Sequence, residues 1–392
     1  MTSGTVRRGL HQPWHPVCAV QRTAADTRGQ GARPVAIRAP YARYTAEVPD
    51  SAVTVTRSSS AVSVRPTDPA IGARALLAEL CRRPAVSGSE LADRLGVTRA
   101  AVWKQIERLR EAGVEIDARA GSGYHLATPL ELLDAPQLRA ALAPATRARL
   151  GDLAVHWQID STNSELLRRA DHDARDRLVC LAEMQSAGRG RRGRAWRMPL
   201  GGGIALSVLK RFEGPMASLA GLSLAVGVAA VEALAACAIG EVGLKWPNDL
   251  VARGAKLGGI LVELGGDALG PCHAVVGLGL NLRLGASAAT IDQACIDLAA
   301  LAPAPSRMQV AARLIDHLLD TLDRFAVHGF GAFADAYARH DALHECEVDV
   351  LQGERRRRGI ARGTDARGAL RIVFAAGEEV VDSGEVSLRV HR

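Results

Sequence analysis

Lysine is scarce in this 392-residue sequence, in which only four of the 49 lysine and arginine residues are lysine. They are Lys104, Lys210, Lys245 and Lys256. GC-rich coding accounts for the shortage, but it does not account for where the remaining lysines stand. An ammonium is a compact point charge and a guanidinium is a wide planar fork. We therefore expect the neighbouring Lys245 and Lys256 to mark positions that need the compact charge.

Paired cysteines are also lacking. None of the seven cysteines belongs to a C-x-x-C pair, and their number is odd. This pattern argues against a disulfide framework and a zinc site, and it predicts a reducing, cytoplasmic location. The seven are Cys18, Cys81, Cys180, Cys237, Cys272, Cys295 and Cys346.

The first 69 residues lack a lasting apolar period and the uninterrupted apolar run of a secretory signal. We interpret residues 1–69 as a disordered extension, or as the product of a start codon placed too far upstream. Nine arginines against four acidic residues give this segment +5 of the total net charge of +7. The basic character of the chain is therefore weak support for a nucleic-acid partner.

One long segment nearly lacks charge, since Glu232 is the only charged residue within residues 216–238. Alanine and glycine dominate this segment rather than leucine and isoleucine, and no cationic belt flanks it. Strand-like runs precede and follow it. We therefore predict a core helix packed against a sheet, and no membrane partner.

Residues 70–128 have the pattern of a winged helix-turn-helix. The stretch "IGARALLAELCRR" predicts a first helix with one leucine-rich face. A second helix begins with Ser87 and Glu90 at the spacing of a capping box and ends at Gly96. Thr98 can cap a third helix, and a hairpin with a Gly-Ser-Gly turn follows. This order predicts a DNA-binding domain.

The third helix would carry the DNA-binding surface. Its apolar positions face the first two helices, which leaves small and basic residues on the opposite side. Small residues let the helix approach a groove, and basic residues reach phosphates or base edges. The alternative is a small helical domain with a solvated basic face, against which the following wing argues. The predicted DNA-binding residues are Arg99, Ala100, Lys104 and Arg108.

The rest of the chain divides into three segments, so that the whole is an α+β multidomain protein. Residues 129–150 contain three prolines and indicate a partly helical linker. Residues 151–342 alternate between strand-like and helix-like runs, which predicts a mixed α/β domain. Residues 343–392 have the short strands and turns of a small SH3-like β-barrel. Their arginine run, residues 355–358, is expected at a solvated strand edge rather than in a nucleic-acid patch.

The densest chemical signal is the string "GRGRRGRAW", from Gly188 to Trp196, which stands between two strand-like runs. Glycines let a loop bring backbone N–H groups onto phosphate oxygens, and arginines add bidentate neutralisation. Such a loop would bind a nucleotide or a carboxylate beside it. A flexible RNA-binding segment has a similar composition, but the flanking apolar strands favour the ordered loop.

Two further strings carry polar residues at the ends of predicted elements. "KWPNDL" begins at Lys245 and is followed by "KLGGILVEL" from Lys256. Its Asn-Asp pair could hold a nucleotide phosphate through Mg²⁺, or it could be a plain turn. "DSTNS" stands where a strand turns into a helix that Thr162 and Glu165 can cap, and its N–H and hydroxyl groups suit a polar ligand.

In this order and with these gaps, "DSTNS", "GRGRRGRAW", "KWPND" and "KLGGILVEL" resemble the biotin protein ligases. With the winged helix in front, the resemblance is to the bifunctional type that is both a ligase and a biotin-operon repressor. It covers the chain from about residue 70 to the end. The resemblance implies that biotin and Mg·ATP give biotinoyl-5′-AMP, whose acyl group passes to one lysine of a biotin carboxyl carrier protein.

The resemblance also implies roles for individual residues. The implied catalytic residues are Lys256, Arg189 and Arg191. The implied biotin-binding residues are Ser161, Thr162, Asn163, Gln185, Arg189, Gly190, Arg191 and Lys256. The residues implied to bind ATP or the adenylate are Gly188, Arg194, Trp196, Asn248, Asp249 and Arg362. Mg²⁺ would arrive with the ATP phosphates rather than at a dedicated protein site.

The implied partners are the carrier protein, operator DNA and a second copy of the chain when ligand is bound. Three alternatives are a regulator that keeps the ligase fold only as a biotin sensor, a lipoate or octanoate ligase, and a ligase that no longer represses. Lys256, Arg189 and Arg191 argue against the first, and the "GRGRRGR" loop argues against the second.

Overall fold

The computed structural model describes residues 69–392 except residues 120, 304–305, 353–354, 383–385 and 391–392. The predicted extension, residues 1–69, lies outside the described residues apart from Pro69, which begins the first helix.

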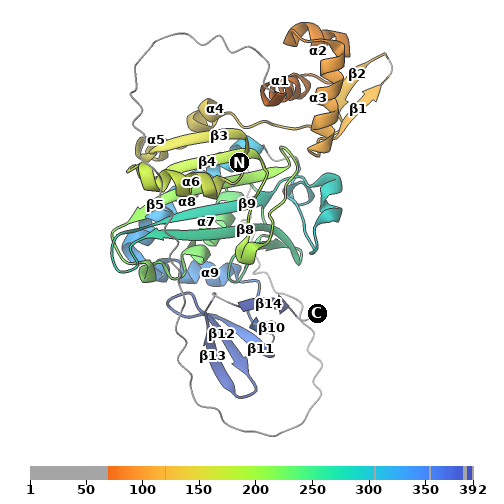
Figure 1. Cartoon of the computed structure of the whole chain (residues 1–392). Helices are drawn as coiled ribbons and strands as arrows, with labels where there is room; N and C mark the ends of the chain where they lie inside the picture. Colours follow the sequence, from red (N-terminus) through yellow and green to blue (C-terminus); the bar gives the residue numbers. More distant parts are fainter. Residues whose placement is uncertain (1–68, 120, 304–305, 353–354, 383–385, 391–392) are drawn as a thin grey trace, which may run out of the picture. The chain divides into compact units, whose positions relative to one another are not determined.

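The described chain starts with three helices and a hairpin, as the sequence predicts for a winged helix-turn-helix (Figure 1). Val102, Ile106 and Leu109 on the third helix are buried in a small core with the leucines of the first. The elements are α1 (Pro69–Arg82), α2 (Gly88–Leu95), α3 (Arg99–Glu111), β1 (Ile116–Arg119) and β2 (Gly123–Leu126).

The predicted helix ends in this domain are confirmed. Ser87 Oγ accepts a hydrogen bond from the Glu90 N–H, and Gly96 ends α2 in the left-handed conformation with φ 63°. Thr98 Oγ1 accepts from the N–H of Ala101, the third residue of α3. The reciprocal half of the capping box does not form, because the Glu90 carboxylate instead pairs with Arg94 one turn later and with an arginine before α2.

The central domain is built on one mixed seven-stranded sheet with the order β3-β4-β5-β9-β8-β7-β6. β3 and β4 are parallel and the other pairs are antiparallel. The strands are β3 (Asp152–Ile159), β4 (Leu178–Gln185), β5 (Gly203–Phe212), β6 (Gly243–Lys245), β7 (Asp249–Ala252), β8 (Ala255–Gly266) and β9 (Cys272–Asn281).

Helices cover both faces of this sheet. α7 (Leu222–Ala235) and α8 (Arg307–His328) pack in the main core, while α6 (Thr162–His172) contributes to a smaller cluster with β4, β5 and β9.

Met216–Ala235 is long and apolar enough to cross a membrane, but 67% of its most apolar window is buried inside the protein. The prediction of a core helix is therefore confirmed. The helix is shorter than predicted, because Gly221 at φ 79° separates α7 from a preceding 3₁₀ turn.

The predicted linker is partly helical, with α4 (Ala135–Ala141) and α5 (Pro144–Arg149). It differs from a loose connection, since Leu133, Leu138 and Leu142 are buried in the core of the central domain. The sequence did not reveal this packing because the apolar residues are spaced irregularly between prolines.

After α9 (Ala334–His340), the C-terminal residues form a five-stranded antiparallel sheet with the order β13-β12-β11-β10-β14. Within the arginine run, Arg356 and Arg358 pair with Asp349, and Arg357 pairs with Glu379. The run is exposed, as expected, but β11 lies inside the sheet, between β10 and β12, rather than at its edge. The strands are β10 (Glu347–Gln352), β11 (Arg355–Thr364), β12 (Leu370–Phe374), β13 (Gly377–Val381) and β14 (Val386–Val390).

Candidate active site

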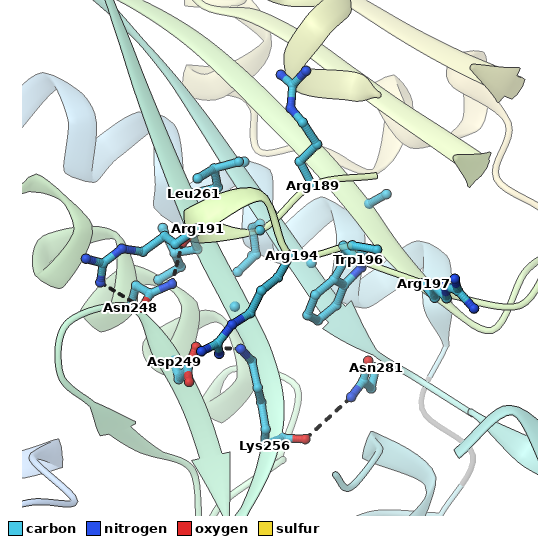
Figure 2. Close-up of a pocket in the computed structure, with 18 of the residues that line it drawn as sticks. Arg189, Arg191, Arg194, Trp196, Arg197, Asn248, Asp249, Lys256, Leu261 and Asn281 are labelled. Atoms are coloured by element: carbon cyan, nitrogen blue, oxygen red, sulfur yellow. Dashed lines mark hydrogen bonds and ion pairs between the residues drawn. The ribbon is translucent and has the colours of Figure 1, made fainter. Parts of the chain in front are cut away.

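A cavity of about 870 Å³ lies over β8 and β9, beneath the Gly/Arg loop and beside the N-terminus of α6 (Figure 2). It gathers residues from all three motifs that the sequence singled out. The predicted ligand-binding residues that line it are Ser161, Thr162, Asn163, Gln185, Arg189, Gly190, Arg191, Arg194, Trp196, Asn248, Asp249 and Lys256.

One end of the cavity is polar, uncharged and deeply buried. Ser161, Thr162 and Asn163 are each at most 4% exposed. Gln185 Oε1 accepts from the Thr162 N–H at 2.8 Å, and Ser207 Oγ lies 2.6 Å from Asn163 Oδ1. Because neighbours fix Thr162, Asn163 and Gln185, this end is preorganised for a neutral polar ligand.

The helix start at this end differs from the expected cap. Ser161, and not Thr162, is the N-cap of α6, and its side chain makes no capping hydrogen bond. The Thr162 hydroxyl instead lies 3.2 Å from Gln185 Oε1. The Thr162 and Asn163 side chains are thus engaged with the cavity wall, whereas Asp160 of the same string pairs with Arg168 of α6.

The other end of the cavity is cationic. Lys256 Nζ lies 2.7 Å from Asp249 Oδ1, and Arg191 Nη1 donates to Asn248 Oδ1 at 3.3 Å. Burial and the adjacent Arg192 guanidinium lower the pKa of Arg191. Figure 2 shows Arg194 extending toward Asp249 and Lys256. Cations held this close together, partly out of water, form a site for an anion.

Charge along the whole cavity is strongly unbalanced. Seven cationic side chains line it, against the two carboxylates of Asp249 and Asp292. Lys245 and Lys256 are both among the seven, so the two neighbouring lysines of this lysine-poor chain face one cavity. The seven are Arg189, Arg191, Arg192, Arg194, Arg197, Lys245 and Lys256.

Two glycines of β9 leave part of the cavity floor without side chains. A Cβ on Gly277 would lie 2.3 Å from the Asn163 amide, and a Cβ on Gly279 would lie 2.4 Å from the Trp196 ring. Trp196 Nε1 is buried and makes no hydrogen bond to the described residues. Its ring faces Lys256, whose Nζ lies 5.9 Å from the ring centroid. An indole held in this way offers a flat surface and a free donor to a ligand.

Two predicted ATP-site residues do not line the cavity. Gly188 lies behind it, and a Cβ there would meet the Trp196 carbonyl oxygen at 2.6 Å, so this glycine permits the fold of the loop. Arg362, on β11, pairs with the carboxylate of Glu345 instead. The structure therefore brings together the predicted central-domain residues except Gly188, and it does not add the predicted residue of the C-terminal sheet.

Several residues around the cavity were not predicted. Ser207 and Glu263 are polar residues within apolar strands, and that was the available signal. Gly277 alternates with apolar residues along β9, which signals a strand face without side chains. Asn281 donates to the carbonyl oxygens of Lys256 and Ile296 and thereby fixes the strand end that carries Lys256.

The predicted DNA-binding residues lie on the outer face of α3. All four are exposed: Ala100, Lys104 and Arg108 lie opposite the buried apolar positions of the helix, and Arg99 is its first residue. Trp103, on the same helix, is 59% exposed.

Comparison with known proteins follows the same division of the chain. Residues 155–281 match the biotin/lipoate A/B protein ligase family, and residues 73–125 match an HTH domain. The bifunctional ligase/repressor BirA of Salmonella typhimurium is 37% identical over 304 residues, which cover 77% of this chain and 93% of that protein. BirA of Escherichia coli is 36% identical over 315 residues, which cover 80% and 96%. The chain belongs to the bifunctional biotin ligase and repressor family.

A solved structure of a biotin protein ligase supports the ligase fold. The biotin protein ligase of Aquifex aeolicus in complex with biotin and ATP is 27% identical, with a TM-score of 0.54 over 61% of this chain and 99% of that one. The membership that the three motifs implied is thus confirmed.

Proposed function

We propose that this cavity joins biotin to ATP and that the chain then transfers the biotinyl group to a lysine of a biotin carboxyl carrier protein. The observation that carries the proposal is the single cavity in which a buried, uncharged polar end adjoins a cationic end. The polar end suits the ureido ring of biotin. The cationic end suits a carboxylate and a triphosphate, two anions that repel each other in water.

In the first step, the biotin carboxylate oxygen attacks the α-phosphorus of ATP, and pyrophosphate leaves. Asn163 and its neighbours hold the ring, while Lys256 and Arg191 neutralise the carboxylate and the α-phosphate as charge develops between them. In the second step, the acceptor lysine amine attacks the acyl carbon, AMP leaves, and the same cations stabilise the departing phosphate. Loop residues over the mixed anhydride shield it from water.

Mg²⁺ fits the site as a companion of ATP. Asp249 is a carboxylate at the cationic end, and Mg²⁺ commonly takes one or two carboxylates together with phosphate oxygens. Asp249 and Asn248 would hold the ion, which would neutralise charge on the leaving pyrophosphate.

The direct test is incubation of the full chain with biotin, ATP and an apo carrier domain, read by the mass of the carrier. We expect the addition of one biotinyl group, and none when the acceptor lysine is replaced by arginine. The same incubation with lipoate or octanoate in place of biotin tests the alternative that the chain is a lipoate or octanoate ligase. Pyrophosphate release with lipoate but not with biotin would contradict the proposal.

The exposed basic face of α3 supports a second activity, repression of transcription at an operator. We infer that the adenylate orders the Gly/Arg loop and favours a dimer that spans two half-sites. Operator affinity and sedimentation should both change on adding biotin and ATP. If neither operator affinity nor sedimentation changes, the chain is a ligase whose DNA binding does not respond to these ligands. We also infer a cytoplasmic location, and closure of the C-terminal sheet into an SH3-like barrel.

A further inference from the structure

Glu263 connects the two ends of the cavity although it lies outside the motifs. It is on β8, in the run "ILVEL", and its side chain is 28% exposed. One carboxylate oxygen accepts from Asn163 Nδ2 at 2.7 Å, and the other lies 3.1 Å from Arg189 Nη2. A single carboxylate therefore holds one residue of the polar end and one residue of the Gly/Arg loop.

The contact with Asn163 fixes the direction of its amide. A carboxylate accepts hydrogen bonds but donates none, so the amide nitrogen must face Glu263. The carbonyl of Leu261 takes the second amide hydrogen, at 3.3 Å. Asn163 Oδ1, which already accepts from Ser207 Oγ, is thus directed to the other side. Its remaining lone pair can accept an N–H from a ligand.

The contact with Arg189 holds that side chain away from the cationic end. Figure 2 shows Arg189 pointing away from Asp249 and Lys256, unlike Arg194. The Arg189 side chain is 43% exposed, so its ion pair with Glu263 is partly screened by water and is readily exchanged. An anionic ligand in the cavity would compete with Glu263 for the same guanidinium.

We propose that Glu263 is a positioning residue of the biotin site, which orients Asn163 for the ring and retains Arg189 until the ligand's anionic group displaces the carboxylate. This inference rests on the proposed function. It predicts that the two contacts have opposite effects on biotin binding. The Asn163 contact strengthens binding, whereas the Arg189 contact opposes it.

Two substitutions separate the contacts in the full chain. Glu263→Gln keeps an acceptor for Asn163 but loses the charge that holds Arg189. We expect biotin to bind about two- to fivefold more tightly, through faster association, which is the scale of a half-exposed ion pair. Glu263→Ala removes both contacts and leaves a buried amide hydrogen without its partner, so we expect binding to weaken by about tenfold.

A control variant and a double-mutant cycle test whether the loss of any negative charge near the site changes biotin binding. Glu165→Gln removes a carboxylate from the first turn of α6, where it pairs with Arg168, and should leave biotin binding unchanged. In an Arg189→Ala background, Glu263→Gln should no longer tighten binding. If Glu263→Gln weakens binding, leaves it unchanged, or tightens it equally without Arg189, the inference is overturned. Failure of the wild-type chain to bind biotin would instead overturn the proposed function.

Discussion

Lys256 Nζ and Asp249 Oδ1 lie 2.7 Å apart at the cationic end of the cavity, which joins the "KLGGILVEL" string to the "KWPND" string. The lysine is 19% exposed and lies beside the Trp196 ring. The Asp249 carboxylate thus pairs with the ammonium that, in our proposal, neutralises the biotin carboxylate and the α-phosphate. When the reactive complex forms, the anionic groups of the ligand would take the place of the Asp249 carboxylate beside the Lys256 ammonium.

We predict that Lys256→Arg behaves like Lys256→Ala and unlike the wild type. A guanidinium is wider than an ammonium and would crowd a cavity that already contains five arginines. Adenylate formation should fall by about 10²-fold or more, the effect of removing one charge-stabilising group. Biotin affinity should fall less, because the polar end remains. Single-turnover formation of biotinoyl-AMP beside equilibrium biotin binding measures both. Near-normal adenylation by the arginine variant would show that any cation suffices.

The two floor glycines should separate the two halves of the site. Gly277→Ala places a Cβ against the Asn163 amide, so we expect biotin to bind about tenfold more weakly. Gly279→Ala places a Cβ against the Trp196 ring, so we expect the KM for ATP to rise by about tenfold with less effect on biotin. Gly331→Ala is the control, since its Cβ would meet no atom within 4 Å. Equal effects of the two variants on both ligands would contradict this division.

Lys104→Ala should weaken operator binding and flatten its dependence on salt, while adenylate formation stays the same. Loss of one phosphate contact lowers the slope of log affinity against log salt by about one. Arg82→Ala, at the end of α1 and 69% exposed, removes the same charge elsewhere in the domain and should change neither. Operator affinities for Lys104→Ala that match the wild type at every salt concentration would mean that α3 does not face DNA.

Asp341 should make stability depend on pH. Burial raises its pKa from 3.8 to about 6, and its Oδ2 accepts no hydrogen bond from the described residues. The pKa of Asp341 is higher in the folded protein than in the unfolded one, so protonated Asp341 contributes to the free energy of unfolding. This contribution is complete below about pH 4 and is lost as the pH rises through about 6. For a pKa raised from 3.8 to about 6, the loss in unfolding free energy is roughly 3 kcal/mol.

Urea unfolding of Asp341→Asn and of the wild type between pH 4 and pH 7 measures this contribution. The difference in unfolding free energy between the two proteins should grow in favour of the asparagine variant as the pH rises. Asp335→Asn, an exposed change on α9, the helix that ends just before Asp341, should leave the pH dependence as it is. A constant difference between Asp341→Asn and the wild type would show that Asp341 is ionised in the folded protein throughout this range.

Short sequence patterns predicted the helix ends correctly where those ends depend on hydrogen bonds between near neighbours in the chain. Ser87, Gly96 and Thr98 act through bonds to neighbours within three or four positions, so their spacing alone indicates where α2 and α3 begin and end. Arg362 shows the opposite case. Its side chain could reach either the cavity or Glu345, and that depends on how β11 packs, which local spacing does not encode.

The sequence by itself determined the order of the domains, the winged helix, and the polar and cationic character of the three motifs. Tertiary structure decided which residues share the cavity. Ser207, Glu263 and Gly277 come from three strands, β5, β8 and β9, which are neighbours in the sheet and far from Asn163 in the chain. Ser207 and Glu263 act through contacts at 2.6–2.7 Å to Asn163 on α6, and Gly277 acts by leaving room for its amide. Such contacts form only after the sheet has assembled, because no short stretch of sequence contains both partners.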